Sequence, residues 1–228
     1  MNKKQLVIGA GLTALVSSPQ AQCAAVSVVF NNTGNDNADR FFMPGDVAGV
    51  VPLANWNNAD LVIAGNAAYG PFRDDNGRAS TLAVGATTGG TPDTWNTWDG
   101  DFNRNINADW ANGLTQMVLS AIPYTSYDLI IYAGANFGND TTDITVGGTT
   151  IRLDDTTGGN PNRTPALTSG IDYVTFSGLS GATQTVDFAN VAGGIGVGGF
   201  QVVEAIPEPS GALLAIIAAG FAGLRRRR

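Results

Sequence analysis

The sequence predicts an all-β fold, an antiparallel β-sandwich or jelly roll, on two observations. Glycine, asparagine, threonine and aspartate dominate the middle of the chain, which holds few of the straight-chain residues that populate helix surfaces. Short apolar runs with period two or with β-branched residues recur between turn residues along the whole middle region. Such closely spaced short strands are typical of sandwiches, and their recurrence argues against disorder.

Turn residues bound each of these runs. Gly147-Gly148 stands between two of them and is typical of a tight hairpin. The acidic pairs Asp74-Asp75 and Asp154-Asp155 are expected in turns, and only 103–113 is expected to form a short helical turn. The ten expected strands are 26–30, 59–64, 80–86, 114–122, 127–133, 143–146, 149–153, 172–176, 185–188 and 198–203.

Residues 1–25 are predicted to be a secretory signal peptide, which forms the N-terminal helix of the expected fold. Lys3 and Lys4 precede the apolar run 6–16, and small residues follow this run. The cleavage is expected between Ala25 and Val26.

The single cysteine of the chain lies inside this leader. A lipid-modified Cys23 is the alternative, although Gln22 stands where such a site needs a small residue. After cleavage at the expected site the mature chain has no thiol, so disulfides and cysteine chemistry are unavailable to it.

The C-terminus combines three features in order. Pro207, Glu208 and Pro209 form a junction that cannot continue a helix. The next 15 residues, Ser210 to Leu224, carry no charge and would form a helix of about 22 Å, against a bilayer core of about 30 Å. This short transmembrane helix suits transient insertion, with a plain single-span membrane protein as the alternative. The cations that follow, which favour the cytoplasmic side, are Arg225, Arg226, Arg227 and Arg228.

These tail residues resemble a PEP-CTERM protein-sorting domain. The resemblance implies a Gram-negative bacterium and an exosortase-type membrane protease that recognises the tail. It also implies transient insertion in the inner membrane, followed by delivery to the cell surface or an exopolysaccharide matrix. Residues 205–228 are therefore expected to be the sorting signal, and residues 26–204 a single β-sandwich domain.

Six stretches of the domain carry a second resemblance: 48–52, 55–58 (Asn55-Trp56-Asn57-Asn58), 122–123, 127–132 (Tyr127-Asp128-Leu129-Ile130-Ile131-Tyr132), 172–176 and 199–203. On these residues the domain resembles bacterial surface modules with a galactose-binding-like β-sandwich. The resemblance implies a fold rather than an activity.

The charge of the expected domain argues against some partners. Of the 19 acidic residues all but Glu208 lie in the domain, whereas only six of the 12 basic residues, all arginines, lie there. An acidic domain is repelled by phosphate backbones, so no nucleic acid partner is expected. Neutral glycans and calcium remain compatible with this charge.

The chain has no histidine, which excludes Ser-His-Asp and Cys-His catalysis. A glycosidase needs two carboxylates across a cleft, and the acids here stand mostly in turn contexts. We therefore expect no catalysis. The alternative is a secreted glycan-active enzyme with paired Asp carboxylates, which burial of such a pair in a cleft would favour.

One stretch is a candidate structural calcium site. Asp99, Asp101 and Asn103 alternate as oxygen ligands do in calcium loops. Arg104 stands where an EF-hand needs glycine and Trp110 where it needs the bidentate glutamate, which excludes an EF-hand. A looser Ca²⁺ site and an ordinary Asx-rich turn both remain open, and no other cofactor is expected.

Aromatic residues suggest a glycan contact. Trp95 and Trp98 lie three apart near expected loops and are the preferred surface pair. Burial in the core is the alternative for each tryptophan, because large aromatics anchor small cores. The threonines are expected to be scattered among loops, with no repeat that would align them on one face.

The sequence as a whole thus predicts a non-catalytic exported protein. Its expected place is the cell surface or the exopolysaccharide matrix, where it acts as a structural or weakly carbohydrate-binding component.

Overall fold

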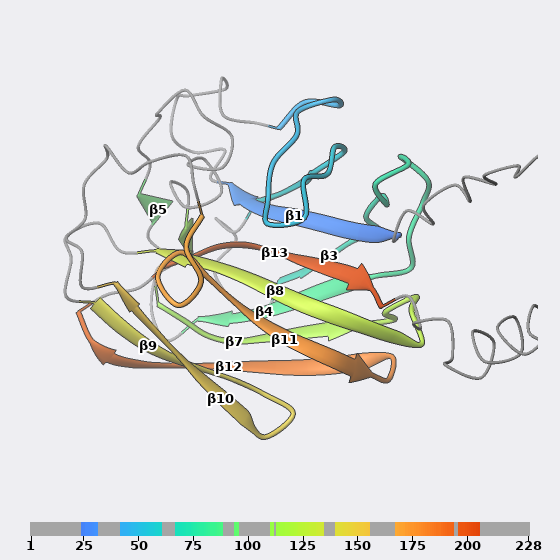
Figure 1. Ribbon diagram of the computed structural model, residues 1–228. Helices are drawn as coiled ribbons and strands as arrows, with labels where there is room; N and C mark the ends of the chain where they lie inside the picture. Colours follow the sequence, from blue (N-terminus) through green and yellow to red (C-terminus); the bar gives the residue numbers. More distant parts are fainter. Residues whose placement is uncertain are drawn as a thin grey trace, which may run out of the picture.

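The computed structural model describes residues 24–31, 42–60, 67–88, 94–95, 110–111, 113–134, 140–155, 167–193 and 196–205. These residues form thirteen strands and no helix. The strands make two sheets that lie face to face, as Figure 1 shows, which confirms the predicted all-β sandwich. The helices expected at the two ends of the chain lie outside the described residues.

The seven-stranded sheet holds the first and last strands side by side. Its order is β11-β8-β13-β1-β2, and β6 pairs with both β13 and β5. Strands β1 and β2 pair parallel, so the expectation of a wholly antiparallel sandwich is wrong at this edge. The strands are β1 (Ala25–Asn31), β2 (Asn57–Asp60), β5 (Thr94–Trp95), β6 (Trp110–Ala111), β8 (Ser126–Gly134), β11 (Tyr173–Ser180) and β13 (Gly196–Glu204).

The six-stranded sheet is antiparallel throughout its pairings, in the order β10-β9-β12-β7-β4-β3. Gly147 and Gly148 connect β9 to β10 with φ of 56° and 81°, the positive values that a two-residue hairpin turn requires, so the predicted hairpin is confirmed. The strands are β3 (Ala67–Tyr69), β4 (Ala83–Thr88), β7 (Leu114–Ser120), β9 (Asp140–Val146), β10 (Thr149–Asp155) and β12 (Thr183–Ala192).

The main hydrophobic core lies between the two sheets. Side chains alternate across a strand, so Met117 and Leu119 of β7 are fully buried while Val118 between them is not. The seven-stranded sheet contributes apolar side chains such as Phe200, whose ring lies 5.9 Å from that of Phe30. The largest fully buried residues of this core are Tyr127, Phe30, Phe200, Leu82, Met117, Leu119, Leu129, Ile131, Ile144 and Leu153.

Each of the ten expected strands overlaps an observed one, and the differences concern short or polar segments. Strands β3, β5 and β6 have three residues or fewer, too few to show a period. Asp74-Asp75 lies in a turn as expected, whereas Asp154 and Asp155 pair with β9 inside β10. Trp110–Ala111 is a strand, so the predicted helical turn is wrong at its C-terminal part, and 103–109 lie outside the described residues.

The outer face of the seven-stranded sheet is apolar and covered. A second hydrophobic cluster forms there, where the segment 42–56 packs over β1, β8 and β13. Trp56 is 5% exposed and its ring lies 5.3 Å from Phe42 and 5.9 Å from Tyr132, so burial is the correct interpretation for this tryptophan. Strands β8 and β13 are therefore buried on both faces, which is why their sequences are nearly continuous apolar runs.

A fully buried glutamine connects the covering segment 42–56 to the seven-stranded sheet through hydrogen bonds. Gln201 of β13 is 0% exposed. Its Nε2 donates to the Val51 carbonyl oxygen at 2.9 Å and to Ser27 Oγ at 3.0 Å. Its Oε1 accepts from the Tyr132 hydroxyl and from the Val51 N–H. The Tyr132 oxygen in turn accepts from the Val50 N–H at 2.8 Å, so the buried polar atoms of this network satisfy one another.

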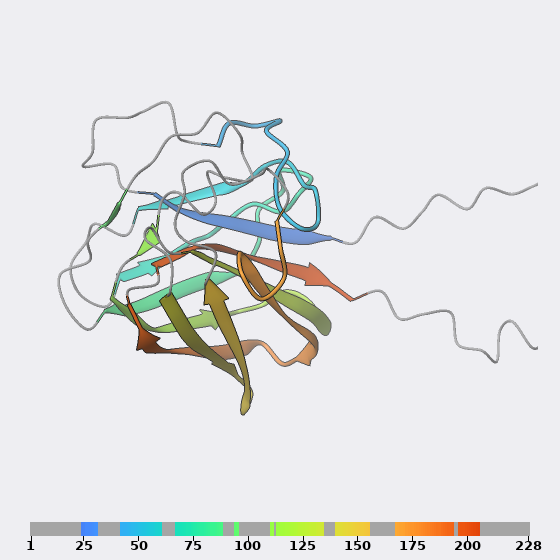
Figure 2. The same cartoon turned by 60° about the vertical axis from the view of Figure 1, so that its left-hand side comes forward.

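The two ends of the described domain lie together. The Glu204 N–H donates to the Ala24 carbonyl oxygen at 2.8 Å, and the Ala205 N–H donates to the Ser126 carbonyl oxygen at 2.9 Å. Figures 1 and 2 show the start of β1 and the end of β13 at the same end of the sandwich. Any segment before Ala24 or after Ala205 is thus attached at this end rather than on a sheet face.

Candidate functional site

The outer face of the six-stranded sheet is exposed and polar, in contrast to the covered face of the other sheet. On β12 the outward residues Thr183, Thr185 and Asp187 are exposed, whereas Val186 between them is fully buried. On β9 the outward Thr145 is flanked by the buried Ile144 and Val146. We call this outer surface of β10, β9, β12, β7 and β4 the polar face.

Strand register aligns the polar side chains into rows. Residues directly opposite each other on neighbouring strands share a sheet face and lie close together. One such row crosses five strands from edge to interior, and hydroxyl, carboxylate and amide groups follow each other along it. The row consists of Thr150, Thr145, Asp187, Gln116 and Thr87.

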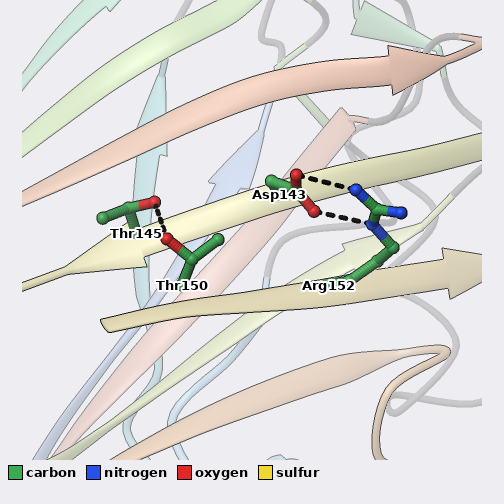
Figure 3. A network of polar contacts seen from close by, with 4 residues as sticks. All are labelled: Asp143, Thr145, Thr150 and Arg152. Atoms are coloured by element: carbon green, nitrogen blue, oxygen red, sulfur yellow. Dashed lines mark hydrogen bonds and ion pairs between the residues drawn. The ribbon is translucent and has the colours of Figure 1, made fainter. Parts of the chain in front are cut away.

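Neighbouring side chains on β9 and β10 hold each other in place (Figure 3). Arg152 donates from Nε and Nη2 to the two carboxylate oxygens of Asp143, at 2.7 and 2.9 Å. The Thr145 and Thr150 hydroxyl oxygens lie 2.8 Å apart and share a hydrogen bond. The hydrogen bond from Arg152 lowers the pKa of the Asp143 carboxyl below its ordinary value, so this ion pair is charged at neutral pH.

Further pairs extend the polar face toward β4. Gln116 Nε2 donates to Asp187 Oδ1 at 2.8 Å, and the Thr115 hydroxyl donates to the Thr87 carbonyl oxygen at 3.1 Å. The face therefore presents paired donors and acceptors on a rigid sheet. Such groups suit the hydroxyl groups of a sugar, although a ligand that replaces internal hydrogen bonds gains little net free energy per bond.

Carboxylates of three described acids accept hydrogen bonds from backbone N–H groups. Asp74 Oδ1 accepts from the Asn76 and Arg78 N–H groups at 3.0 and 2.7 Å. Asp172, at 6% exposed, accepts from the Thr168 N–H at 2.7 Å. Asp128 accepts from the Gly178 N–H at 2.8 Å. Asp74 and Asp172 cap local turns, and Asp128 links β8 to β11. Among the side chains that the structure describes, Asp172 is the one buried acid.

The end of the sandwich near Ala24 and Glu204 carries negative charge around a tyrosine. Burial raises the pKa of Tyr124, and the nearby carboxylates of Asp75, Asp74 and Glu204 raise it further. Burial likewise raises the pKa of Tyr132 in the network under the cover. Both phenols are therefore neutral hydrogen-bonding groups at physiological pH.

Few of the sequence-predicted site residues fall in the described part. The backbone of Trp95 lies in β5, where its cross-strand partner is Trp110 of β6. The expected surface pair of Trp95 with Trp98 stays a prediction, because Trp98 lies outside the described residues. Outside the described residues lie Trp98, the calcium candidates Asp99, Asp101 and Asn103, and the sorting residues Pro207, Glu208, Pro209, Arg225, Arg226, Arg227 and Arg228.

Two negative findings apply to the described ranges alone. Within them, no group of three or more His, Cys, Asp or Glu side chains lies close enough together to hold a metal ion. Among the same residues, no helix has the length and apolar character needed to cross a membrane.

The polar face was not predicted from the sequence because no alignment of the threonines on one face was expected, which is wrong for four of them. Thr145, Thr150, Thr183 and Thr185 lie in strands and face the same side of one sheet. The sequence signal that indicates this face is the period-two alternation in 141–146 and 183–188, where polar residues occupy every second position.

No family model matches the sequence, and no curated protein matches it. One solved structure to which the chain is similar is a Bacteroides uniformis beta-glucuronidase 2 covalently bound to cyclophellitol-6-carboxylate aziridine, with a TM-score of 0.42 and 9% identity. The similarity covers 80% of this chain and 18% of that chain, so the chain spans less than a fifth of that protein's length.

Proposed function

We propose that this protein is an exported, non-catalytic β-sandwich that binds polysaccharide weakly through its polar face. In this proposal the β-sandwich has the jelly-roll topology of galactose-binding-like domains. The C-terminal tail sorts it, through transient insertion in the inner membrane and an exosortase-type protease, to the cell surface or the exopolysaccharide matrix. There it acts as a structural component of a Gram-negative envelope.

The observation that carries the binding role is the asymmetry of the two outer sheet faces. The cluster of Trp56, Tyr132 and Phe42 closes one face, while the other presents exposed hydroxyl, carboxylate, amide and guanidinium groups. The placement of the described acids in turn caps, strand pairs and an exposed ion pair supports binding over the alternative of paired catalytic carboxylates across a cleft.

The position of the domain's ends supports the sorting role. Ala24 and Glu204 lie together at one end of the sandwich, so the leader and the tail are both attached there. Only Ala205 and Ile206 separate the last strand from Pro207. A chain held in a membrane by its tail would keep the polar face, which runs along the strands, free for a glycan.

Binding is tested by affinity electrophoresis of the purified mature protein in gels that contain dextran, galactomannan, xyloglucan or the acidic polysaccharide alginate. We expect retardation by at least one neutral polysaccharide and none by alginate, because the domain is acidic. Replacing Thr145 and Thr150 together, or Asp143 and Arg152 together, with alanine removes both partners of a contact. Each double variant is expected to weaken binding about fivefold, which is the order of effect of losing one hydrogen bond to a ligand.

The matched control is Arg78→Ala, because Arg78 is also an exposed arginine but lies on the 74–78 turn. This variant should bind like the unaltered protein. If both double variants are retarded as strongly as the unaltered protein, the polar face is not the binding surface. Release of new reducing ends from any of the polysaccharides would instead favour the glycan-active enzyme.

Sorting is tested by replacing Arg225 to Arg228 with four glutamines or, as the charge-preserving control, with four lysines. The glutamine variant should lose its hold on the cytoplasmic side and leave the cell envelope with its tail uncut. The lysine variant should be processed like the unaltered chain. Cell fractionation and intact mass measure both outcomes, and normal trimming of the glutamine variant would contradict the sorting role.

A further inference from the structure

The first two described residues belong to the folded domain. Ala25 opens β1, is 0% exposed and pairs with Val203 of β13. One residue earlier, the Ala24 carbonyl oxygen accepts the Glu204 N–H at 2.8 Å. The contact between the first and last strands therefore starts at Ala24, two residues before the start expected from the sequence.

The turn at 74–78 holds Ala25 from its other side. The Asp75 N–H donates to the Ala25 carbonyl oxygen at 2.9 Å, and the Ala25 N–H donates to Asp75 Oδ1 at 3.3 Å. Ala25 thus lies between β13 and this turn, with hydrogen bonds from both of its backbone polar groups.

Cleavage between Ala25 and Val26 would act against this arrangement in two ways. It would remove a buried residue together with three hydrogen bonds to Asp75 and Glu204. It would also place a new α-ammonium group on Val26, which is 0% exposed. A buried charge needs a compensating partner, and its desolvation is strongly unfavourable.

We propose that the leader is cut after Cys23 and that the mature protein begins at Ala24. Ala21, Gln22 and Cys23 provide the small-x-small pattern that a signal peptidase needs before the cut. The new ammonium group then lies on Ala24, which is only half-buried. The Asp75 carboxylate that contacts the next residue provides a nearby opposite charge. This inference rests on the proposed export.

The proposed cleavage site is tested by determining the N-terminus of the exported protein. The full chain is expressed in a Gram-negative host, and the envelope and secreted fractions are analysed by intact mass and by sequencing of the N-terminal peptide. The expected product begins at Ala24. A product that begins at Val26, or at a lipid-modified Cys23, overturns this cleavage site and leaves export intact. A chain that keeps Met1 and is found in the cytoplasmic fraction of the same cells overturns export and this inference together.

A pair of leader variants tests the same point without touching the folded domain. Ala21→Tyr puts a bulky side chain three residues before the proposed cut and is expected to lose most of the mature product, with precursor accumulating instead. Gln22→Tyr, the matched control, alters the tolerant middle position and should be processed normally. For a cut after Ala25, Ala21 lies too far upstream to matter, so normal processing of Ala21→Tyr overturns the proposal.

Discussion

Replacing Gln201 with leucine is expected to lower the free energy of unfolding by about 3–5 kcal/mol, because two or three buried polar groups lose their partners at about 1–3 kcal/mol each. Leucine has nearly the volume of glutamine but makes no hydrogen bonds. The Ser27 hydroxyl and the Val51 carbonyl would lose their donor, and the Val51 N–H its acceptor. The segment 42–56 would then keep its apolar contacts and the hydrogen bond from the Val50 N–H to the Tyr132 hydroxyl, but would lose every bond to Gln201.

Urea unfolding measures the change in stability, and limited proteolysis locates it. We expect new cleavage in 42–56 under conditions where the unaltered protein stays whole. Gln116→Leu is the matched control, since Gln116 makes one side-chain bond on the exposed polar face, and surface changes of this kind usually stay within about 0.5 kcal/mol. Equal stabilities of the two variants would show that the buried network does not hold the cover.

Replacing Gly199 with alanine is expected to lower the free energy of unfolding by about 3 kcal/mol or more, at the upper end of the range for overpacked cores. A Cβ atom at Gly199 would lie 2.3 Å from the Val28 carbonyl oxygen and 3.1 Å from Val29 Cα. Both are backbone atoms of β1, so neither moves without separating β1 from β13. These two strands lie at the centre of the seven-stranded sheet.

Gly147→Asn is the matched control for Gly199→Ala. Gly147 has a φ of +56° and nothing within 4 Å of an added Cβ, and asparagine tolerates this left-handed backbone. The control should keep its yield and its urea midpoint, whereas Gly199→Ala should lower both. A midpoint for Gly199→Ala equal to that of the unaltered protein would contradict the close approach of β1 and β13.

The positions of the strands were largely predictable, because a strand's alternation of buried and exposed side chains is visible in its own residues. The run 185–188 alternates polar and apolar residues, and it lies inside β12. The Gly147-Gly148 turn was predictable for the same local reason, since glycine marks positive φ. Asp154 and Asp155 were misassigned because acidic residues also occupy exposed edge strands, where β10 places them.

The candidate binding face was harder to predict than the strands. Alternation shows which residues share a face, but it does not show which strands become neighbours. Thr150, Thr145 and Asp187 form a row only because β9 pairs with both β10 and β12. Spacing along the chain likewise does not show that Trp95 stands opposite Trp110 in the register of β5 and β6.

By itself the sequence determined the all-β class, the approximate strands, the acidic character of the domain and the patterns at its two ends, because composition, period and charge order are local properties. The tertiary structure alone decided the membership of the two sheets, the parallel pairing of β1 with β2, and which outer face is covered. Those features depend on contacts between residues far apart in the chain. Gln201 illustrates this point, since its partners Ser27, Val51 and Tyr132 come from three distant segments that meet only in the folded protein.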